Sequence, residues 1–149
     1  YLLVMYDGYT PVLFITLTER NDRDPIKMME DVSLFLQRLS HKTKSHLLIH
    51  RGGDYDGNLH EHICVCVPDQ ELDRFENRLA RFTPWKNWRY KTLDFQRWDF
   101  SKGAGAFLYT SNHDDFPVYV VCPKQFRSCR NGHCEHQHQD YRRIRRIES

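Results

Sequence analysis

The feature that most constrains the fold is the alternating stretch at residues 59–67, LHEHICVCV. Successive side chains of a β-strand point to opposite faces, so His60 and His62 share one face, about 6–7 Å apart. The apolar residues on the other face are Ile63, Val65 and Val67. Such a strand needs cover on its apolar face and can present two imidazoles to a metal ion on the other.

The preceding residues predict a hairpin partner for this strand. Residues 46–51 (HLLIHR) are apolar and β-prone, and residues 52–58 (GGDYDGN) have the composition of a turn. Symmetric pairing about this turn places His50 opposite His60 on the same face, as a third metal ligand. A lone His-x-His pair also occurs in proteins that bind no metal, so the other elements must decide.

Length and composition indicate one domain, with at most a small appendage. The 149 residues are 40% hydrophobic, enough for a core, and the net charge is +2. We see no apolar run of the roughly 20 residues that cross a membrane and no signal peptide, so we expect a soluble protein without a membrane partner. Because the chain starts at Tyr1 within an apolar stretch, we expect a fragment of a longer protein.

A strand and two helices are predicted around the hairpin. Residues 11–20 alternate, with Ile15 and Leu17 on one side and Thr16 and Thr18 on the other, a pattern shared by ordinary half-exposed strands. Asp24 and Pro25 open a helix that runs to about residue 40, with an apolar stripe of Met29, Val32, Phe35, Leu36 and Leu39. Pro68 and Asp69 open a second helix with the stripe Leu72, Phe75, Leu79 and Phe82.

The remaining pattern completes an α+β fold. Residues 85–95 read as a strand that interleaves aromatic and basic residues, 100–109 as a short helix and 118–121 as a last strand. A hairpin between two helices pairs antiparallel, so we predict a central antiparallel sheet with helices on one face. The other face carries His60, His62 and Thr16.

Taken in order, these motifs resemble the HUH superfamily of single-strand DNA endonucleases, whose core is RRM-like. Residues 14–18 (FITLT) look like the family's first motif, residues 60–62 (HEH) like the metal-binding second, and the helix ending at Tyr109 like the tyrosine-bearing third. The resemblance covers most of residues 11–121 and is closest to parvovirus and densovirus nickases. It implies an endonuclease domain at 1–121, followed by a Cys/His-rich basic extension at 122–149.

The resemblance implies a metal-dependent nicking reaction. A divalent ion, Mn²⁺ or Mg²⁺, held by the histidines would polarise the scissile phosphate. Tyr109 would attack the phosphorus to give a 5′-phosphotyrosine link and a free 3′-hydroxyl. The alternatives within the superfamily are a transposase and a plasmid relaxase.

The sequence departs from the family pattern at three places. Glu61 stands between the histidines, where the family has a bulky apolar residue. The third ligand of parvoviral relatives is commonly acidic, so Asp54 and Asp56 are alternatives to His50; a three-histidine site would favour Mn²⁺, Co²⁺ or Zn²⁺. The lysine that usually follows the nucleophile is missing, and either His113 or Lys102 would replace it.

The C-terminal extension predicts a second metal site. Cys122, Cys129, Cys134 and His138, or His136 in place of the last, have the compact spacing of a CCCH zinc finger. Five cysteines without a secretory context favour free thiols or metal ligands over disulfides. The alternative is a histidine-rich tail with unpaired thiols.

Basic residues distributed along the chain are candidates for DNA contact, although those on the second helix also suit a plain solvated face. The candidates, together with Thr16, are Arg74, Arg78, Lys86, Arg89, Lys91, Arg142 and Arg143. The expected partners are single-stranded and duplex origin DNA, with a helicase domain in the longer chain. We expect the host nucleus if the protein is parvoviral, and an intracellular location otherwise. The competing hypothesis is a non-catalytic RRM-like or zinc-finger nucleic-acid-binding module.

Overall fold

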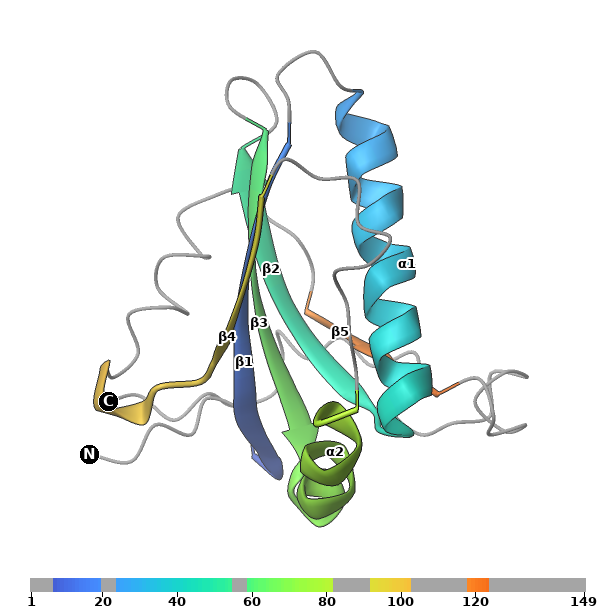
Figure 1. The fold of residues 1–149 in the computed structure, drawn as a ribbon, viewed down its shortest axis with the longest axis vertical. Helices are drawn as coiled ribbons and strands as arrows, with labels where there is room; N and C mark the ends of the chain where they lie inside the picture. Colours follow the sequence, from blue (N-terminus) through green and yellow to red (C-terminus); the bar gives the residue numbers. More distant parts are fainter. Residues whose placement is uncertain (1–6, 20–23, 55–58, 82–91, 103–117, 124–149) are drawn as a thin grey trace.

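The computed structural model describes residues 7–19, 24–54, 59–81, 92–102 and 118–123 (Figure 1). Its strands are β1 (Tyr9–Thr18), β2 (Leu47–Asp54), β3 (His60–Pro68), β4 (Thr92–Arg97) and β5 (Tyr119–Val121). Its α-helices are α1 (Pro25–Thr43) and α2 (Leu72–Leu79), and two 3₁₀ turns span Asp69–Glu71 and Phe100–Lys102. Within the described ranges, no helix combines the length and the apolar character needed to cross a membrane.

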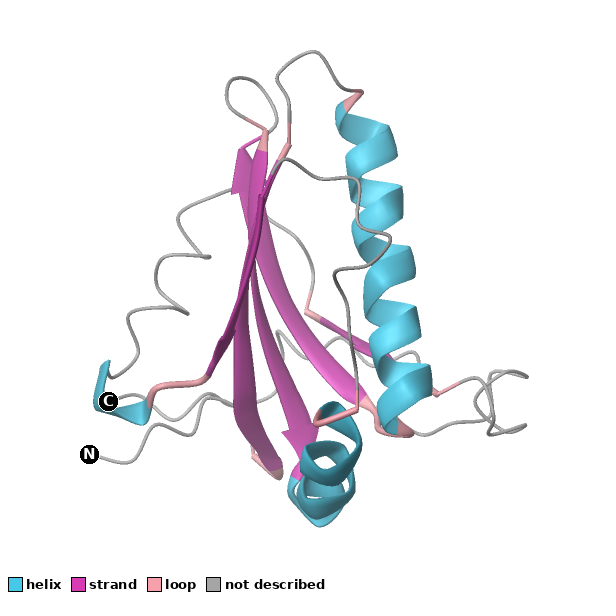
Figure 2. Cartoon of the chain, in the orientation of Figure 1, coloured by secondary structure: helices cyan, strands magenta, loops and turns pink. Residues whose placement is uncertain are grey.

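The five described strands form one sheet in the order β4-β1-β3-β2-β5, and every neighbouring pair is antiparallel. Both α-helices lie on the same side of this sheet (Figure 2). The predicted α+β class, with an antiparallel sheet and helices on one face, is therefore confirmed.

The main core lies between the sheet and the helices. The strand residues that face the helices alternate as predicted on β1, where Ile15 and Leu17 are fully buried and Thr16 and Thr18 are half-buried. On α1 the buried stripe contains Met28 rather than the predicted Met29, followed by the predicted Val32, Phe35, Leu36 and Leu39. Phe75 and Leu79 of α2 enter the same cluster and Leu72 packs against it, as predicted, whereas Phe82 lies outside the described residues.

Capping groups define both ends of α1. At its start, the Asp24 carboxylate accepts a hydrogen bond from the Ile26 N–H at 3.0 Å, and Pro25 holds the first position. At its end, Lys44 adopts a left-handed conformation with φ of 50°, and its N–H bonds back to the last turn.

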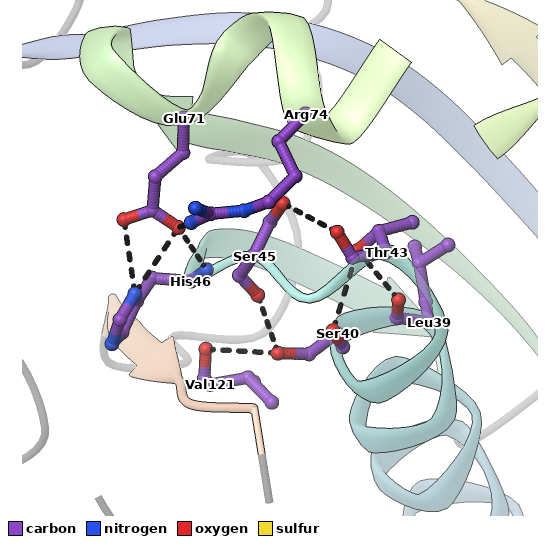
Figure 3. A network of polar contacts seen from close by, with 8 residues as sticks. All are labelled: Leu39, Ser40, Thr43, Ser45, His46, Glu71, Arg74 and Val121. Carbon is purple, nitrogen blue, oxygen red and sulfur yellow. Dashed lines mark hydrogen bonds and ion pairs between the residues drawn. The ribbon is translucent and has the colours of Figure 1, made fainter. Parts of the chain in front are cut away.

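A polar network joins the end of α1 to two strands (Figure 3). The Ser40 hydroxyl donates to the Ser45 carbonyl at 2.6 Å and lies 3.4 Å from the Val121 carbonyl. The Thr43 hydroxyl donates to the Leu39 carbonyl at 2.7 Å. These buried contacts hold the helix end against the start of β2 and against β5.

Some predicted boundaries differ from the observed ones. Residues 52–54, expected in the turn, extend β2, because β3 supplies hydrogen-bonding partners as far as the Asp54–His60 pair. Backbone pairing thus overrides the turn composition of these residues. Strand β4 continues to Arg97, beyond the predicted end at residue 95. Of the predicted helix at 100–109, only the 3₁₀ turn Phe100–Lys102 lies within the described residues.

Candidate functional site

The candidate site lies on the sheet face opposite the helices, at the end of the sheet next to the loop between β2 and β3. Cross-strand pairing aligns Thr16 of β1 with His62 of β3, and Thr18 with His60. On the outer side of Thr16, β4 contributes Asp94. On the far side of His62, β2 contributes Gly52 and therefore no side chain. The predicted grouping of Thr16, His60 and His62 on one face is confirmed.

Three contacts of the His62 ring define its orientation. The Thr16 hydroxyl lies 3.1 Å from the His62 Nδ1 atom. The Phe14 ring stacks on the imidazole, with centroids 5.7 Å apart and planes 14° from parallel. The His60 ring meets it edge-on, at 5.2 Å between centroids and 70° between planes. Together, Thr16 at the Nδ1 atom, the stacked Phe14 ring and the edge-on His60 ring restrain the orientation of the His62 imidazole.

The predicted partner of His60 was wrong. His50 pairs with Cys64, four residues from the expected register, and it is buried, with 6% of its surface exposed. Asp54, named from the sequence as an alternative ligand, is the residue that pairs with His60. The register was misjudged because Gly52 and Gly53 were assigned to the turn, whereas they extend the strand and shorten the loop.

The residues at this site suit a divalent metal in part. Two imidazoles converge, and the position opposite His60 belongs to an acidic residue, which gives the donor types that Mn²⁺ and related ions accept. Within the described residues, no three His, Cys, Asp or Glu side chains form a group that could hold a metal ion. The second alternative ligand, Asp56, lies outside the described residues. The three-ligand site therefore remains a prediction.

An ion pair lies behind the histidines, on the helix side of the same strand. Arg51 of β2 is 4% exposed, and Glu61, between His60 and His62, is fully buried. Arg51 Nε and Glu61 Oε1 form an ion pair, and Arg51 Nη2 donates to Glu61 Oε2 at 2.9 Å. The charge of Glu61, the residue between the two histidines, is thus balanced by Arg51 on β2.

This ion pair extends into a larger polar cluster. Arg51 Nη1 donates to the Tyr119 hydroxyl at 3.1 Å and to the Ser33 hydroxyl at 3.2 Å, and Nη2 lies 3.5 Å from the Met29 carbonyl. Burial opposes the charge on Arg51, but the Glu61 carboxylate outweighs it and raises the arginine pKa above its ordinary value. For Tyr119, burial has the opposite effect on the pKa and raises it above its ordinary value.

The sequence analysis missed Arg51 and Tyr119. The available signal was one of opposite charges at two inward-facing positions of adjacent strands, Arg51 and Glu61. Using that signal requires the correct hairpin register, which places Arg51 next to Ile63 and diagonally from Glu61.

A second, basic surface lies on α2. Arg74, Asn77, Arg78 and Arg81 line a hollow of about 460 Å³ with no acidic residue among its described lining. Asn77 and Arg78 follow Arg74 by three and four residues, which puts these three side chains on the side of α2 away from Phe75 and Leu79, and Arg81 lies just beyond the helix end. The predicted DNA contacts Arg74 and Arg78 therefore share one surface, on the opposite side of the sheet from the histidines.

Glu71 connects this surface to His46, the residue directly before β2 (Figure 3). Its carboxylate accepts hydrogen bonds from the His46 backbone N–H at 2.8 Å and pairs with Arg74 at 3.1 Å. The His46 ring nitrogen Nδ1 lies 3.0 Å from Glu71 Oε2. Burial would raise the pKa of Glu71, but the hydrogen bonds from His46, helped by Arg74, hold it below its usual range.

The histidine face also carries an apolar cluster. A second buried cluster there consists of Tyr9, Leu48, Cys64, Cys66, Val118 and Val120, flanked by Phe14, Trp98 and Cys122. Among the described residues, Cys64, Cys66 and Cys122 are not in disulfide bonds. Cys122 is half-buried, and the other predicted zinc ligands, Cys129, Cys134, His136 and His138, lie outside the described residues.

Several further predicted residues also lie outside the described part. They are the nucleophile candidate Tyr109, its neighbour His113 and the basic residues Lys86, Arg89, Lys91, Arg142 and Arg143. Lys102 is described only as the last residue of the 3₁₀ turn Phe100–Lys102.

Comparison of the chain with models of protein families, with curated proteins and with solved structures finds no match.

Proposed function

We propose that this chain is a metal-dependent, site-specific single-strand DNA nickase of the HUH type, acting in replication initiation. The observation that carries the proposal is the meeting of His60 and His62 on the polar face of a central strand, beside Thr16 of the neighbouring strand. These residues belong to two motifs far apart in the sequence. Their convergence on the face away from the helices is the arrangement expected if both motifs serve one site.

The packing around the segment that contains Tyr109 also supports the proposal. Trp98 precedes residues 103–117 and Val118 follows them, and both contact the same cluster on the histidine face. Described residues before and after this segment, Trp98 and Val118, therefore lie on the face that carries His60 and His62.

The chemistry proposed for this chain is an in-line transesterification. A divalent ion held by His60, His62 and a third ligand such as Asp54 would supply Lewis-acid polarisation of the phosphate. The Tyr109 hydroxyl oxygen attacks phosphorus, the bond from phosphorus to the 3′ oxygen breaks, and the proton lost by tyrosine balances the one gained by the 3′-hydroxyl. The phosphodiester energy is kept in the tyrosyl ester, so rejoining the strand requires no nucleotide cofactor.

The basic hollow on α2 fits the second part of the proposal, a grip on the DNA backbone. Its three arginines suit phosphate oxygens, which arginine contacts in pairs, although Arg74 also forms an ion pair with Glu71. Because the hollow and the histidines lie on opposite sides of the sheet, one DNA segment can be gripped while another is cut. The proposed setting is a viral replication initiator with a helicase domain, in the host nucleus.

The test is the formation of a covalent adduct. The domain is incubated with Mn²⁺ and a pool of labelled single-stranded origin and hairpin sequences, and the products are separated on a denaturing gel. We expect a protein–DNA adduct that is lost in Tyr109→Phe and in His62→Ala. The matched control is Tyr119→Phe, which removes a tyrosine hydroxyl bonded to Arg51 on the helix side and should keep the adduct.

One result would count against Tyr109 as the nucleophile, and another against the nickase itself. An adduct that survives Tyr109→Phe would show that the nucleophile is another residue. Good DNA binding by the wild type without any adduct would instead support the non-catalytic binding module. In that case, Arg78→Ala should still weaken binding and reduce the slope of log K against log salt by about 1.

A further inference from the structure

The hydroxyl of Thr16 contacts the one histidine nitrogen whose protonation decides how His62 can bind a metal. Thr16 and His62 are directly paired across β1 and β3, and the Thr16 Oγ1 to His62 Nδ1 distance is 3.1 Å. β1 is itself held between β3 and β4, so the threonine backbone is fixed on both sides. The contact is therefore part of the sheet and needs no loop to form it.

A neutral imidazole carries one proton, on either Nδ1 or Nε2, and the other nitrogen keeps the lone pair. If Nδ1 is protonated, it donates to the Thr16 oxygen, and Nε2 is the nitrogen that can bind a metal. If Nε2 is protonated, the threonine hydroxyl donates to Nδ1 instead, and neither nitrogen can bind a metal without a change of tautomer. The hydroxyl can serve as acceptor or donor, so the distance alone suits both arrangements.

The surroundings of the ring fix which of its nitrogens faces Thr16. The stacked Phe14 ring and the edge-on His60 ring restrain the imidazole in its plane, with the Nδ1 atom toward β1. In this orientation Nδ1 is occupied by the protein. A metal shared with His60 must therefore use Nε2 of His62.

We propose that Thr16 is a positioning residue that holds His62 in its Nδ1–H tautomer and thereby selects Nε2 as the metal ligand. The inference rests on the metal site of the proposed function and gives Thr16 a role other than the DNA contact expected from the sequence. A residue of the first motif, residues 14–18, would then orient a metal ligand of the second motif, residues 60–62. Hydrogen-bond partners of this kind typically change metal affinity by about 10–100-fold.

Three variants test the inference. Thr16→Val keeps the shape and the strand preference but removes the hydroxyl, and Thr16→Ser restores it. Thr18→Val is the matched control, since Thr18 lies on the same strand and face, opposite His60. Circular dichroism and urea midpoints establish that all three fold.

Two measurements are made on each protein. The ¹⁵N shifts of the His62 ring give its tautomer without metal, and calorimetric titration with Mn²⁺ and with Zn²⁺ gives the metal affinity. We expect the Nδ1–H form in the wild type and in Thr16→Ser. Metal affinity should fall about 10–100-fold in Thr16→Val and stay within about threefold in Thr16→Ser and Thr18→Val.

The outcomes separate the two proposals. An Nε2–H tautomer in the wild type, or unchanged metal affinity in a folded Thr16→Val, would overturn the role of Thr16 and leave the nickase standing. Wild-type protein that binds neither ion, or binds both equally well after His62→Ala, would overturn the metal site and the role of Thr16 together.

Discussion

Replacing Glu61 by leucine should destabilise the protein more than any surface change, because it leaves the buried Arg51 without its counter-ion. Removing one member of a buried ion pair typically costs about 3–5 kcal/mol. The Tyr119 and Ser33 hydroxyls still accept hydrogen bonds from Arg51 in the variant. We therefore expect Glu61→Leu to lower the free energy of unfolding by about 3 kcal/mol, at the lower end of this range. That is a large part of the roughly 5–15 kcal/mol that stabilise a typical domain.

The double variant tests the reasoning more strictly. Arg51→Met removes the guanidinium and leaves the Glu61 carboxylate in the core, so it should cost about as much as Glu61→Leu or more. The combination Arg51→Met with Glu61→Leu leaves no buried charge at this place and should cost far less than the sum. We expect a favourable coupling energy above about 3 kcal/mol.

The measurement is equilibrium unfolding in urea, with the free energy of unfolding taken from the midpoint and slope. The matched control is Glu76→Leu, which breaks the Arg97–Glu76 ion pair, whose side chains are 57% and 33% exposed. It should cost less than about 1 kcal/mol. If Glu61→Leu costs no more than this control, or if the two core substitutions are additive, the ion pair does not have the role described.

Three other predictions concern the remainder of the fold. Folding lowers the pKa of Glu71, so this residue stabilises the folded state. Its contribution to stability is complete above the ordinary glutamate pKa of about 4.3 and is lost as the pH falls through the pKa of Glu71 in the folded protein. Glu71→Gln should thus lower the melting temperature at pH 7 but not at pH 2, and an equal loss at both would refute this. Burial raises the pKa of Cys66, so iodoacetamide should label Cys122 before Cys66 in native protein, as read by peptide mass spectrometry. Leu36→Ala, at a fully buried position, should cost about 2–5 kcal/mol in urea unfolding, and a loss under 1 kcal/mol would contradict its place in the core.

The local pattern of the sequence was enough to identify most of the described elements. The N-cap at Asp24, the proline at 25 and the apolar spacing that follows describe a helix that needs no information from elsewhere in the chain. Alternation on β1 and β3 likewise assigned Ile15 to the core and His62 to the opposite face. Both periodicities are properties of short segments, so they can be read before the segments are paired.

The tertiary structure decided what depends on register. Whether His50 or Asp54 stands opposite His60 depends on where the hairpin loop begins, and two glycines that suit a turn are instead paired in the sheet. The same register sets the partner of Glu61. This residue departs from the apolar residue of the family pattern, and its counter-ion, Arg51, belongs to another strand. The contact of Thr16 with His62 joins residues 46 positions apart. Such pairings follow from the energy of the whole sheet and cannot be read from either segment alone.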